Sequence, residues 1–132
     1  MVIDTSAIVA IFRAEPERRQ FMQMIADADV RIISAATVLE TGIVLESKRG
    51  ENAGREFDLF LSRMQIAVVD VDAEQVEIAR RAWRKFGRGR HRAALNLGDC
   101  FAYALAKTSG EPLLAKGDDF AQTDIQLCVL PS

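Results

Sequence analysis

Histidine and cysteine, the residues that support zinc and redox sites, are scarce in this chain: it has one histidine and two cysteines among 132 residues. Cys100 and Cys128 lie far apart, without Cys-x-x-Cys or Cys/His spacing, so we expect buried, reduced thiols. No run of roughly 18 apolar residues is present, and the N-terminus lacks the pattern of a signal peptide. These absences predict a cytoplasmic protein that does not enter a membrane.

The composition is that of a folded domain with an unevenly distributed charge. Apolar residues make up 49% of the chain, so we expect one domain over residues 1–132. The net charge of −2 argues against a uniformly basic nucleic-acid binder. However, seven of the 17 Lys and Arg residues lie between Arg80 and Arg92, where there is no acid. The sequence therefore predicts a local positive face on an acidic protein.

Short apolar segments alternate with helical periodicities along the whole chain. Strands are expected at Val2–Asp4, Arg31–Ser34, Ile66–Val71, Pro112–Ala115 and Leu127–Leu130. Helices are expected at residues 7–12, 16–28, 35–49, 51–64, 73–86 and 98–108, with Ser6 capping the first. In the helix at residues 73–86, Val76, Ala79 and Trp83 are predicted to face the core. Stacking on nucleic-acid bases is the alternative for Trp83 and Tyr103, but both lie on apolar helical faces, so we favour the core. This alternation predicts a parallel sheet with helices on both faces.

Acidic residues occur at four places where ordinary explanations compete with a functional one. Asp4 ends the first strand, where a helix cap or turn is the alternative. Glu40 shares a helix face with apolar residues, although an exposed surface glutamate is possible there. Asp99 opens a helix, where an N-cap is equally plausible, and Asp118 and Asp119 follow a strand and fit a simple turn. Each acid alone leaves the choice open.

Taken together, the acids predict a site for a divalent cation. Burying a carboxylate is costly unless a positive charge compensates it, and clustered carboxylates also repel one another. Mg²⁺ and Mn²⁺ are hard ions that take oxygen ligands and need neither His nor Cys. Such an ion can activate water for attack on a phosphodiester and stabilise the leaving oxygen. The paucity of histidine therefore favours Mg²⁺ or Mn²⁺ over zinc.

Four segments carry a resemblance to a known family: Val2–Ala7, Ala36–Glu40, Leu97–Ala106 and Leu114–Phe120. They resemble the acidic motifs of PIN domains, and they are closest in pattern to the VapC toxins of bacterial toxin–antitoxin pairs. The resemblance covers essentially the whole chain, in order and at the right length. It implies a three-layer α/β/α fold around a central parallel sheet of four to five short strands.

The resemblance also implies a function. PIN-domain toxins are ribonucleases that depend on Mg²⁺ or Mn²⁺, are inhibited by a VapB-type antitoxin and commonly form homodimers. Asp4, Glu40 and Asp99 match the first three acids of the motif. The last motif departs from the common pattern, because it reads Lys-Gly-Asp-Asp-Phe, so we favour Asp118 as the fourth acid and keep Asp119 as the substitute.

The matched residues take roles that follow from the family. Asp4 and Asp99 would bind one ion most directly, with Glu40 acting through water or as a base. Asp118 or Asp119 would help to hold a second ion.

Two groups of residues lie around these acids in the expected site. Thr5 or Ser6 would orient the attacking water. The basic segment supplies RNA-binding candidates whose planar guanidinium groups suit phosphate: Arg84, Arg88, Arg90 and Arg92. A solvated helix face is the alternative for this segment.

Two other functions are compatible with parts of the sequence. A receiver-like phosphoacceptor domain has a similar length, an Asp after an early strand and a Lys after a late one, for which Lys116 is the candidate. It would, however, need an adjacent pair of acids after the first strand, which this chain lacks. A non-catalytic PIN-like binding module would retain the acids without turnover.

Overall fold

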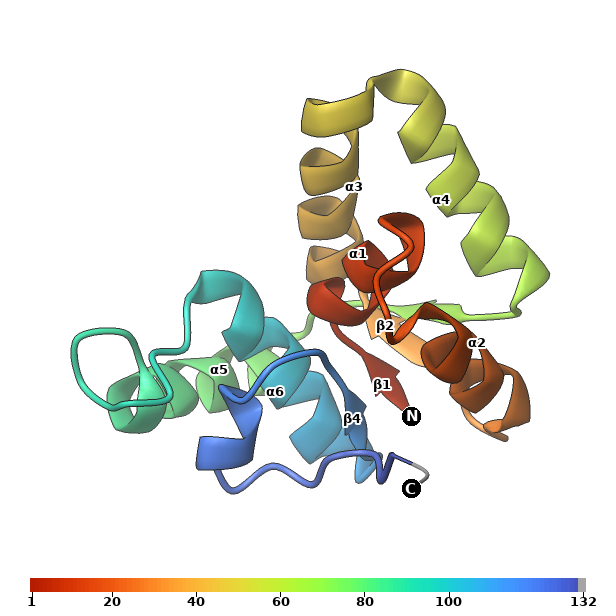
Figure 1. Cartoon of the computed structure of the whole chain (residues 1–132). Helices are drawn as coiled ribbons and strands as arrows, with labels where there is room; N and C mark the ends of the chain where they lie inside the picture. The colour runs from red at the N-terminus through yellow and green to blue at the C-terminus, as the bar shows by residue number, and fades with distance from the viewer. Residues whose placement is uncertain (131–132) are drawn as a thin grey trace.

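A four-stranded parallel sheet lies at the centre of the protein, in a computed structural model that describes residues 1–130 (Figure 1). Its strands are β1 (Val2–Ile3), β2 (Ile32–Ser34), β3 (Ala67–Val69) and β4 (Leu113–Leu114), in the order β3-β2-β1-β4. The helices are α1 (Thr5–Phe12), α2 (Arg18–Asp27), α3 (Ala35–Arg49), α4 (Glu51–Arg63), α5 (Ala73–Phe86) and α6 (Leu97–Ser109), followed by a short 3₁₀ helix, η1 (Phe120–Gln122). The predicted alternation of strands and helices is therefore confirmed.

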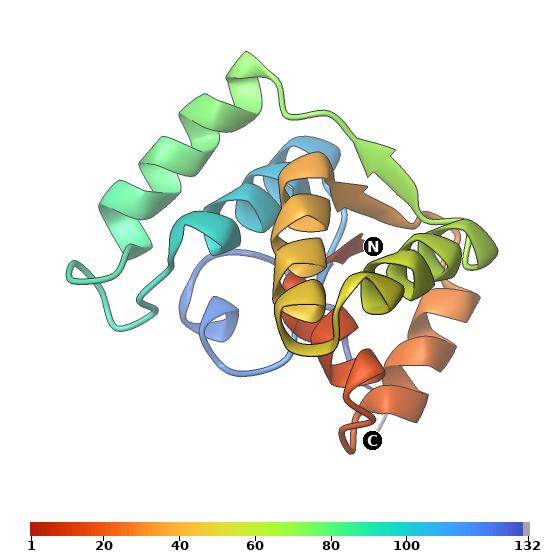
Figure 2. The same cartoon turned by 90° about the horizontal axis from the view of Figure 1, so that it is seen from above.

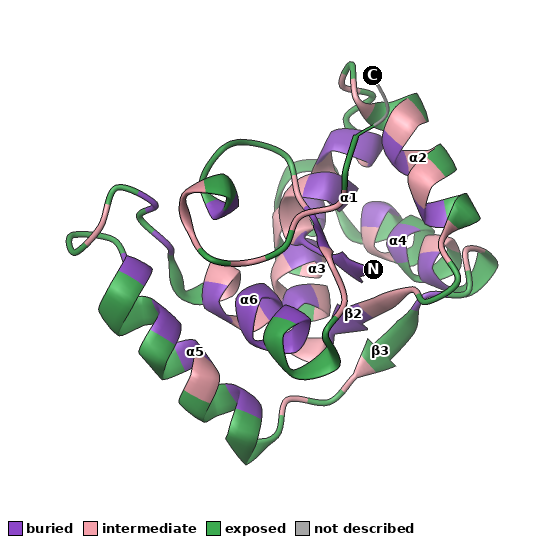
Figure 3. Ribbon diagram, turned by 90° about the horizontal axis from the view of Figure 1, so that it is seen from below, coloured by how far each residue is buried: buried purple, intermediate pink, exposed green. Residues whose placement is uncertain are grey.

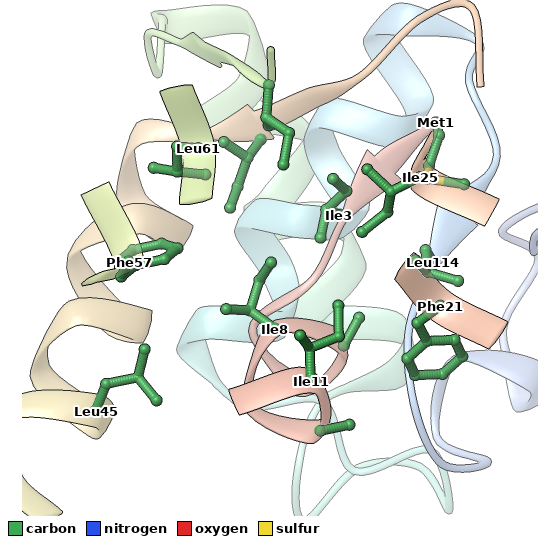
Figure 4. Packing of buried hydrophobic residues seen from close by; sticks show 14 of the residues in the cluster. Met1, Ile3, Ile8, Ile11, Phe21, Ile25, Leu45, Phe57, Leu61 and Leu114 are labelled. Carbon is green, nitrogen blue, oxygen red and sulfur yellow. The ribbon is translucent and has the colours of Figure 1, made fainter. Parts of the chain in front are cut away.

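Two apolar clusters, one on each face of the sheet, give the protein its three layers. Successive strand residues point to opposite faces, so Ile3 and Leu114 pack with α1, α2, α3 and α4, whereas Val2 and Leu113 pack with α5 and α6. Figure 4 shows the first cluster, in which Ile3 lies among side chains from the surrounding helices. Figure 2 shows α3 between the α5–α6 pair and α4. This is the expected α/β/α arrangement.

The order of the strands distinguishes this sheet from that of a receiver domain. In a flavodoxin-like sheet with the order 2-1-3-4-5, the first strand lies between the second and the third. Here β1 lies between β2 and β4. The receiver-like alternative therefore does not describe this fold.

Local capping chemistry sets several of the boundaries. Ser34 accepts a hydrogen bond from the amide of Ala36 at the start of α3, and Asp72 accepts one from Gln75 at the start of α5. Helix α3 ends at Lys48-Arg49, followed by Gly50 with φ +80°. At α1 the prediction was wrong, because Asp4 rather than Ser6 is the cap and the helix begins at Thr5.

Two further predictions were wrong. The segment Leu127–Leu130 forms no regular strand within the described residues, because it meets β4 in a single bridge between Leu113 and Leu127. On α5, Ala79 is buried but Val76 and Trp83 are 43% and 44% exposed. Figure 3 shows why: α5 is buried along one side and exposed over the rest of its surface.

The predictions about the cysteines agree with the structure in part. Cys100 is buried, Cys128 is half-buried, and both are free thiols. Across residues 1–130, none of the helices combines the length and apolar character that crossing a bilayer requires.

Candidate active site

Asp4 is the most deeply buried acid of the site, with 4% of its surface exposed. It follows β1, and its Oδ2 accepts hydrogen bonds from the Ser6 amide at 3.0 Å and the Ser6 hydroxyl at 2.7 Å. Burial raises the pKa of Asp4, and the charge of Glu40 raises it further against the opposing effect of these hydrogen bonds. The hydrogen bonds from Ser6 thus orient the Asp4 carboxylate, while burial disfavours its charged form.

Glu40 comes to the same place from α3. The Thr5 hydroxyl donates to Glu40 Oε1 at 2.6 Å, and Thr5 Oγ1 lies 2.9 Å from the hydroxyl oxygen of buried Thr41. The carboxylate of Glu40 rests against Gly98 of α6, where an added Cβ atom would lie 2.0 Å from Glu40 Oε2. Glycine at position 98 is therefore what allows Glu40 to reach the start of α6.

Asp99 lies in the first turn of α6, where it both caps the helix and belongs to the group of acids. It completes a capping box, because its Oδ2 accepts from the Asn96 amide at 3.0 Å while Asn96 Oδ1 accepts from the Asp99 amide at 2.9 Å. Burial, together with the charges of Asp4, Glu40 and Asp119, raises the pKa of Asp99 to about 6, against the opposing effect of the Asn96 hydrogen bond. The N-cap interpretation and the site interpretation are thus compatible.

In the last motif, the charge of Asp119 acts on this group and that of Asp118 does not. Both side chains are exposed, but Asp119, and not Asp118, is among the charges that raise the pKa of Asp99. The Lys116 amide just after β4 donates to Ser6 Oγ at 2.9 Å, which ties this loop to the Asp4 turn. We call Asp4, Glu40, Asp99 and Asp119 the acid cluster.

The basic segment lies next to the acid cluster. Arg84, Arg88 and Arg90 line a groove of about 520 Å³ between α5 and the start of α6, together with Arg80, Asn96 and Leu97. We call this the arginine groove. Arg92 is exposed but does not line it. His91 is used structurally, since its Nδ1 accepts from the Ala93 amide at 3.0 Å and its ring packs edge-on against Phe86.

Comparison with known proteins identifies the family. The family model for the PIN domain matches residues 1–126. A protein named Ribonuclease VapC from Mycolicibacterium smegmatis is 57% identical over 125 residues, which are 95% of this chain and 97% of that protein. This chain is a PIN domain of the VapC family. Ribonuclease VapC30 from Mycobacterium tuberculosis is also similar, at 51% identity over 131 residues, 99% of this chain and 100% of the relative.

Solved structures agree with the fold of this VapC-family domain. The crystal structure of Mycobacterium tuberculosis VapC20, described as a sarcin-ricin loop cleaving toxin, matches with a TM-score of 0.79 at 21% identity over 98% of both chains. VapBC-1 from nontypeable Haemophilus influenzae matches with a TM-score of 0.75 at 14% identity, over 96% of this chain and 95% of that one. At these identities the likeness shows a shared fold.

The acid cluster of this PIN domain fits a hydrated divalent ion. None of the ion pairs found in residues 1–130 involves Asp4, Glu40, Asp99 or Asp119, so the chain itself supplies no compensating cation. Within the same residues, no three His, Cys, Asp or Glu side chains are placed to bind one ion together. Mg²⁺ commonly keeps several of its waters and is bound by only one or two carboxylates. Two of these acids, with water completing the coordination, are therefore enough to bind it.

Three supporting residues of this VapC-family site were missed in the sequence. Gly98 makes room for Glu40, Thr41 lies behind Thr5, and Asn96 orients Asp99. Asn96 was detectable, because Asn followed three residues later by an acid at a helix start indicates a capping box. Gly98 and Thr41 act on residues distant in the sequence, and no local pattern reveals such contacts.

Proposed function

We propose that this VapC-family protein is an endoribonuclease that depends on Mg²⁺ or Mn²⁺ and acts as the toxin of a toxin–antitoxin pair. One observation carries the proposal: acids that follow β1, lie on α3 and α6, and come from the loop after β4 meet without an ion pair to any of them in residues 1–130. The charge of Glu40 raises the pKa of Asp4, and the charges of Asp4, Glu40 and Asp119 raise the pKa of Asp99. A divalent ion neutralises such a group, and the names of the similar proteins indicate RNA as the substrate.

Asp4 and Asp99 are the proposed ligands, because Asp4 is buried and Asp99 is half-buried beside it. When bound, the ion would activate water and stabilise the charge that develops on phosphate oxygens. Ser6 holds Asp4 in place by donating its hydroxyl hydrogen bond, and Asn96 does the same for Asp99 through its amide. Preset carboxylates need no rearrangement when an ion and substrate arrive.

Glu40 is the proposed base that accepts the proton of the attacking water. Its Oε1 is engaged by Thr5, and Gly98 leaves space for the carboxylate next to Asp99. We assign both hydroxyls, Thr5 and Ser6, to positioning the carboxylates rather than to direct contact with water. As the fourth acid we propose Asp119 in preference to Asp118, because its charge is felt at Asp99.

The arginine groove is the proposed binding surface for the RNA backbone. Arg84, Arg88 and Arg90 line it beside the acid cluster, and Arg92 extends the positive charge along the same loop. Arginine suits this role because its guanidinium group can donate two parallel hydrogen bonds to a phosphate.

Cleavage of RNA with and without Mg²⁺, by the wild type and by Asp99→Asn, tests the proposal. We expect cleavage by the wild type with Mg²⁺ or Mn²⁺, loss of cleavage in EDTA and loss in the variant. Asn keeps the shape of the capping side chain, so a fall in activity will not reflect loss of α6. Undiminished cleavage by Asp99→Asn would refute the assignment, and ion binding without turnover on any RNA would favour the non-catalytic module.

We also propose a VapB-type antitoxin as the partner of this chain and a homodimer as its assembly. The support for the antitoxin is that solved neighbours of this fold include a toxin–antitoxin complex from Klebsiella pneumoniae and VapBC2 from Rickettsia felis. Co-purification with the product of an adjacent small reading frame, followed by recovery of ribonuclease activity on its removal, tests the antitoxin. Light scattering of the purified chain tests the dimer.

A further inference from the structure

Trp83 is a large apolar residue of the arginine groove that phosphate binding does not explain. Its indole lies near the C-terminal end of α5 and is 44% exposed. One edge of the ring lies against Gly87: an added Cβ atom there would lie 2.5 Å from Trp83 Cδ1, so the glycine leaves space for the indole. The ring is therefore an exposed aromatic surface that lines the groove.

The exposed ring is covered by a side chain that can move away. The Arg90 guanidinium carbon lies 4.3 Å from the Trp83 ring centroid, which is the geometry of a cation–π contact. Arg90 itself is exposed and belongs to the loop between α5 and α6. The base of that loop is fixed, because the Arg88 amide donates to the Leu95 carbonyl and the Leu95 amide donates to the Phe86 carbonyl, each at 3.0 Å.

The surroundings of the ring combine apolar surface with unpaired positive charge. Val76 and Leu97, which are 43% and 76% exposed, lie in the groove with Trp83. Arg84, Arg88 and Arg90 line it as well, and none of them has an ion pair with an acid of residues 1–130. An occupant that matches both properties must be flat and apolar in one part and anionic in another.

An unpaired nucleotide has this combination, because its base stacks on aromatic rings and its phosphate pairs with arginine. The volume of about 520 Å³ lies within the range of small-ligand sites. The groove also begins at the acid cluster, since Asn96 lines the groove and donates its amide hydrogen bond to Asp99. An RNA strand with a phosphate at the acids can therefore place a neighbouring base at Trp83.

We propose that Trp83 is a base-stacking site for an unpaired nucleobase next to the cleaved bond. The base takes the position of the Arg90 guanidinium over the indole, and Arg90 moves to a flanking phosphate. This inference rests on the proposed ribonuclease function and adds to it a residue that holds a base, which must be unpaired because the bases of a closed duplex are not free to stack.

Tryptophan fluorescence tests the site directly, because Trp83 is the only tryptophan of the chain. The experiment uses full-length protein carrying Asp99→Asn, so that RNA is bound without being cut. Two probes are compared: a short single-stranded RNA of mixed sequence, and inorganic polyphosphate, which has the charge but no base. We expect the RNA to quench the fluorescence strongly and polyphosphate to leave it largely unquenched while competing for the arginines.

Substitution provides a second readout in the same background. Trp83→Leu is expected to weaken RNA binding about 10-fold and to leave polyphosphate binding unchanged, whereas Trp83→Phe retains most of the affinity because a ring remains. Leu59→Ala, at an exposed apolar residue of α4, is the matched control and should bind RNA as the parent does. The rescue by Phe separates stacking from a loss of folding.

Three results would overturn the inference. The first is equal quenching by both probes, and the second is an RNA affinity that is unchanged in Trp83→Leu. The third is fluorescence that varies with protein concentration alone, because this would indicate that a second copy covers the groove.

Failure of the inference can be distinguished from failure of the proposed function. If the wild type cuts no RNA with Mn²⁺, the proposed function fails. If the wild type cuts RNA and Trp83→Leu does so with the same KM, the stacking site alone is refuted.

Discussion

The acid cluster and the arginine groove lie side by side at the start of α6, but they are built in opposite ways. Three of the four acids are held by hydrogen bonds from neighbouring side chains or amides: Ser6 donates to Asp4, Thr5 to Glu40 and Asn96 to Asp99. The groove arginines are exposed, and no acid of residues 1–130 forms an ion pair with them. Within the proposed function, the difference separates a part that must be fixed from one that must adapt.

The two regions do not neutralise each other despite their proximity. No ion pair within residues 1–130 joins an arginine of the groove to an acid of the cluster, and the capping box directs Asp99 toward the Asn96 amide. Each region therefore keeps its charge for a ligand. We expect substitutions in the acid cluster to change kcat and substitutions in the arginine groove to change KM, and the predictions below test that division.

The largest effect is expected for Asp4→Asn. Removing a proposed ligand of the ion should lower RNA cleavage by about 100-fold or more. Because burial raises the pKa of Asp4, the substitution also removes an unfavourable buried charge, and the metal-free protein should be as stable as the wild type or more so. Cleavage assays and urea unfolding of the same samples measure both. Asp58→Asn, at an exposed position on α4, is the control.

Gly98→Ala should come next, with a fall in kcat of about 10- to 100-fold. The added methyl group would overlap the Glu40 carboxylate and force it away from Asp99, and small displacements of catalytic groups have effects of this size. Alanine would otherwise favour the helix. Gly42→Ala on α3 is the matched control, because its Cβ would have its nearest neighbour at 3.9 Å. Equal loss of activity in both variants would contradict the assignment of Glu40.

The combined change of Arg84, Arg88 and Arg90 to Gln should raise KM about 10-fold with little effect on kcat. Each lost phosphate contact reduces the slope of log affinity against log salt by about 0.7 for a single strand, so the slope should fall by about 2. The control removes three exposed arginines from α2 and α4, at Arg18, Arg19 and Arg63. A slope that falls equally in the control would mean that net charge alone attracts the RNA.

The smallest effect concerns stability against pH in EDTA. The folded protein holds the pKa of Asp99 at about 6, above its ordinary value of 3.8, so the fold binds this proton more tightly than the unfolded chain does. The contribution is therefore fully present below pH ~4 and is lost as the pH rises through about 6. After allowance for solvent screening of a half-buried group, it amounts to about 1 kcal/mol.

Urea unfolding of the wild type and Asp99→Asn between pH ~4 and ~7 measures this contribution. The wild type should lose more stability than the variant over this interval, and added Mn²⁺ should restore stability at the upper end. The same pH dependence in both proteins would show that Asp99 is not the responsible group.

The elements that were predicted well are those whose boundaries are set locally. Helix α5 begins after the Asp72 cap and α3 ends before Gly50, both as predicted, because capping residues and glycine act within a few residues. Trp83 was placed wrongly for a different reason. Periodicity shows that a helix has an apolar stripe, but α5 packs mainly on α6, so part of its stripe is left uncovered.

The candidate site, like the fold, could be predicted from the sequence only in part. Parallel strands deliver their carboxyl ends to one edge, so the meeting of Asp4 with the acids of α3 and α6 followed from the expected fold. The choice between Asp118 and Asp119 did not, since adjacent loop residues point in directions that only tertiary packing decides. The site assignment stays a prediction until an ion is measured there.

Binding of Mn²⁺ to the wild type and to Asp4→Asn, measured by calorimetry near neutral pH without RNA, tests the central claim most directly. The claim is that carboxylates brought together from separate parts of the chain hold a divalent ion. We predict binding to the wild type that is lost in Asp4→Asn and unaffected in Asp58→Asn. Equal binding by the wild type and Asp4→Asn would contradict the account.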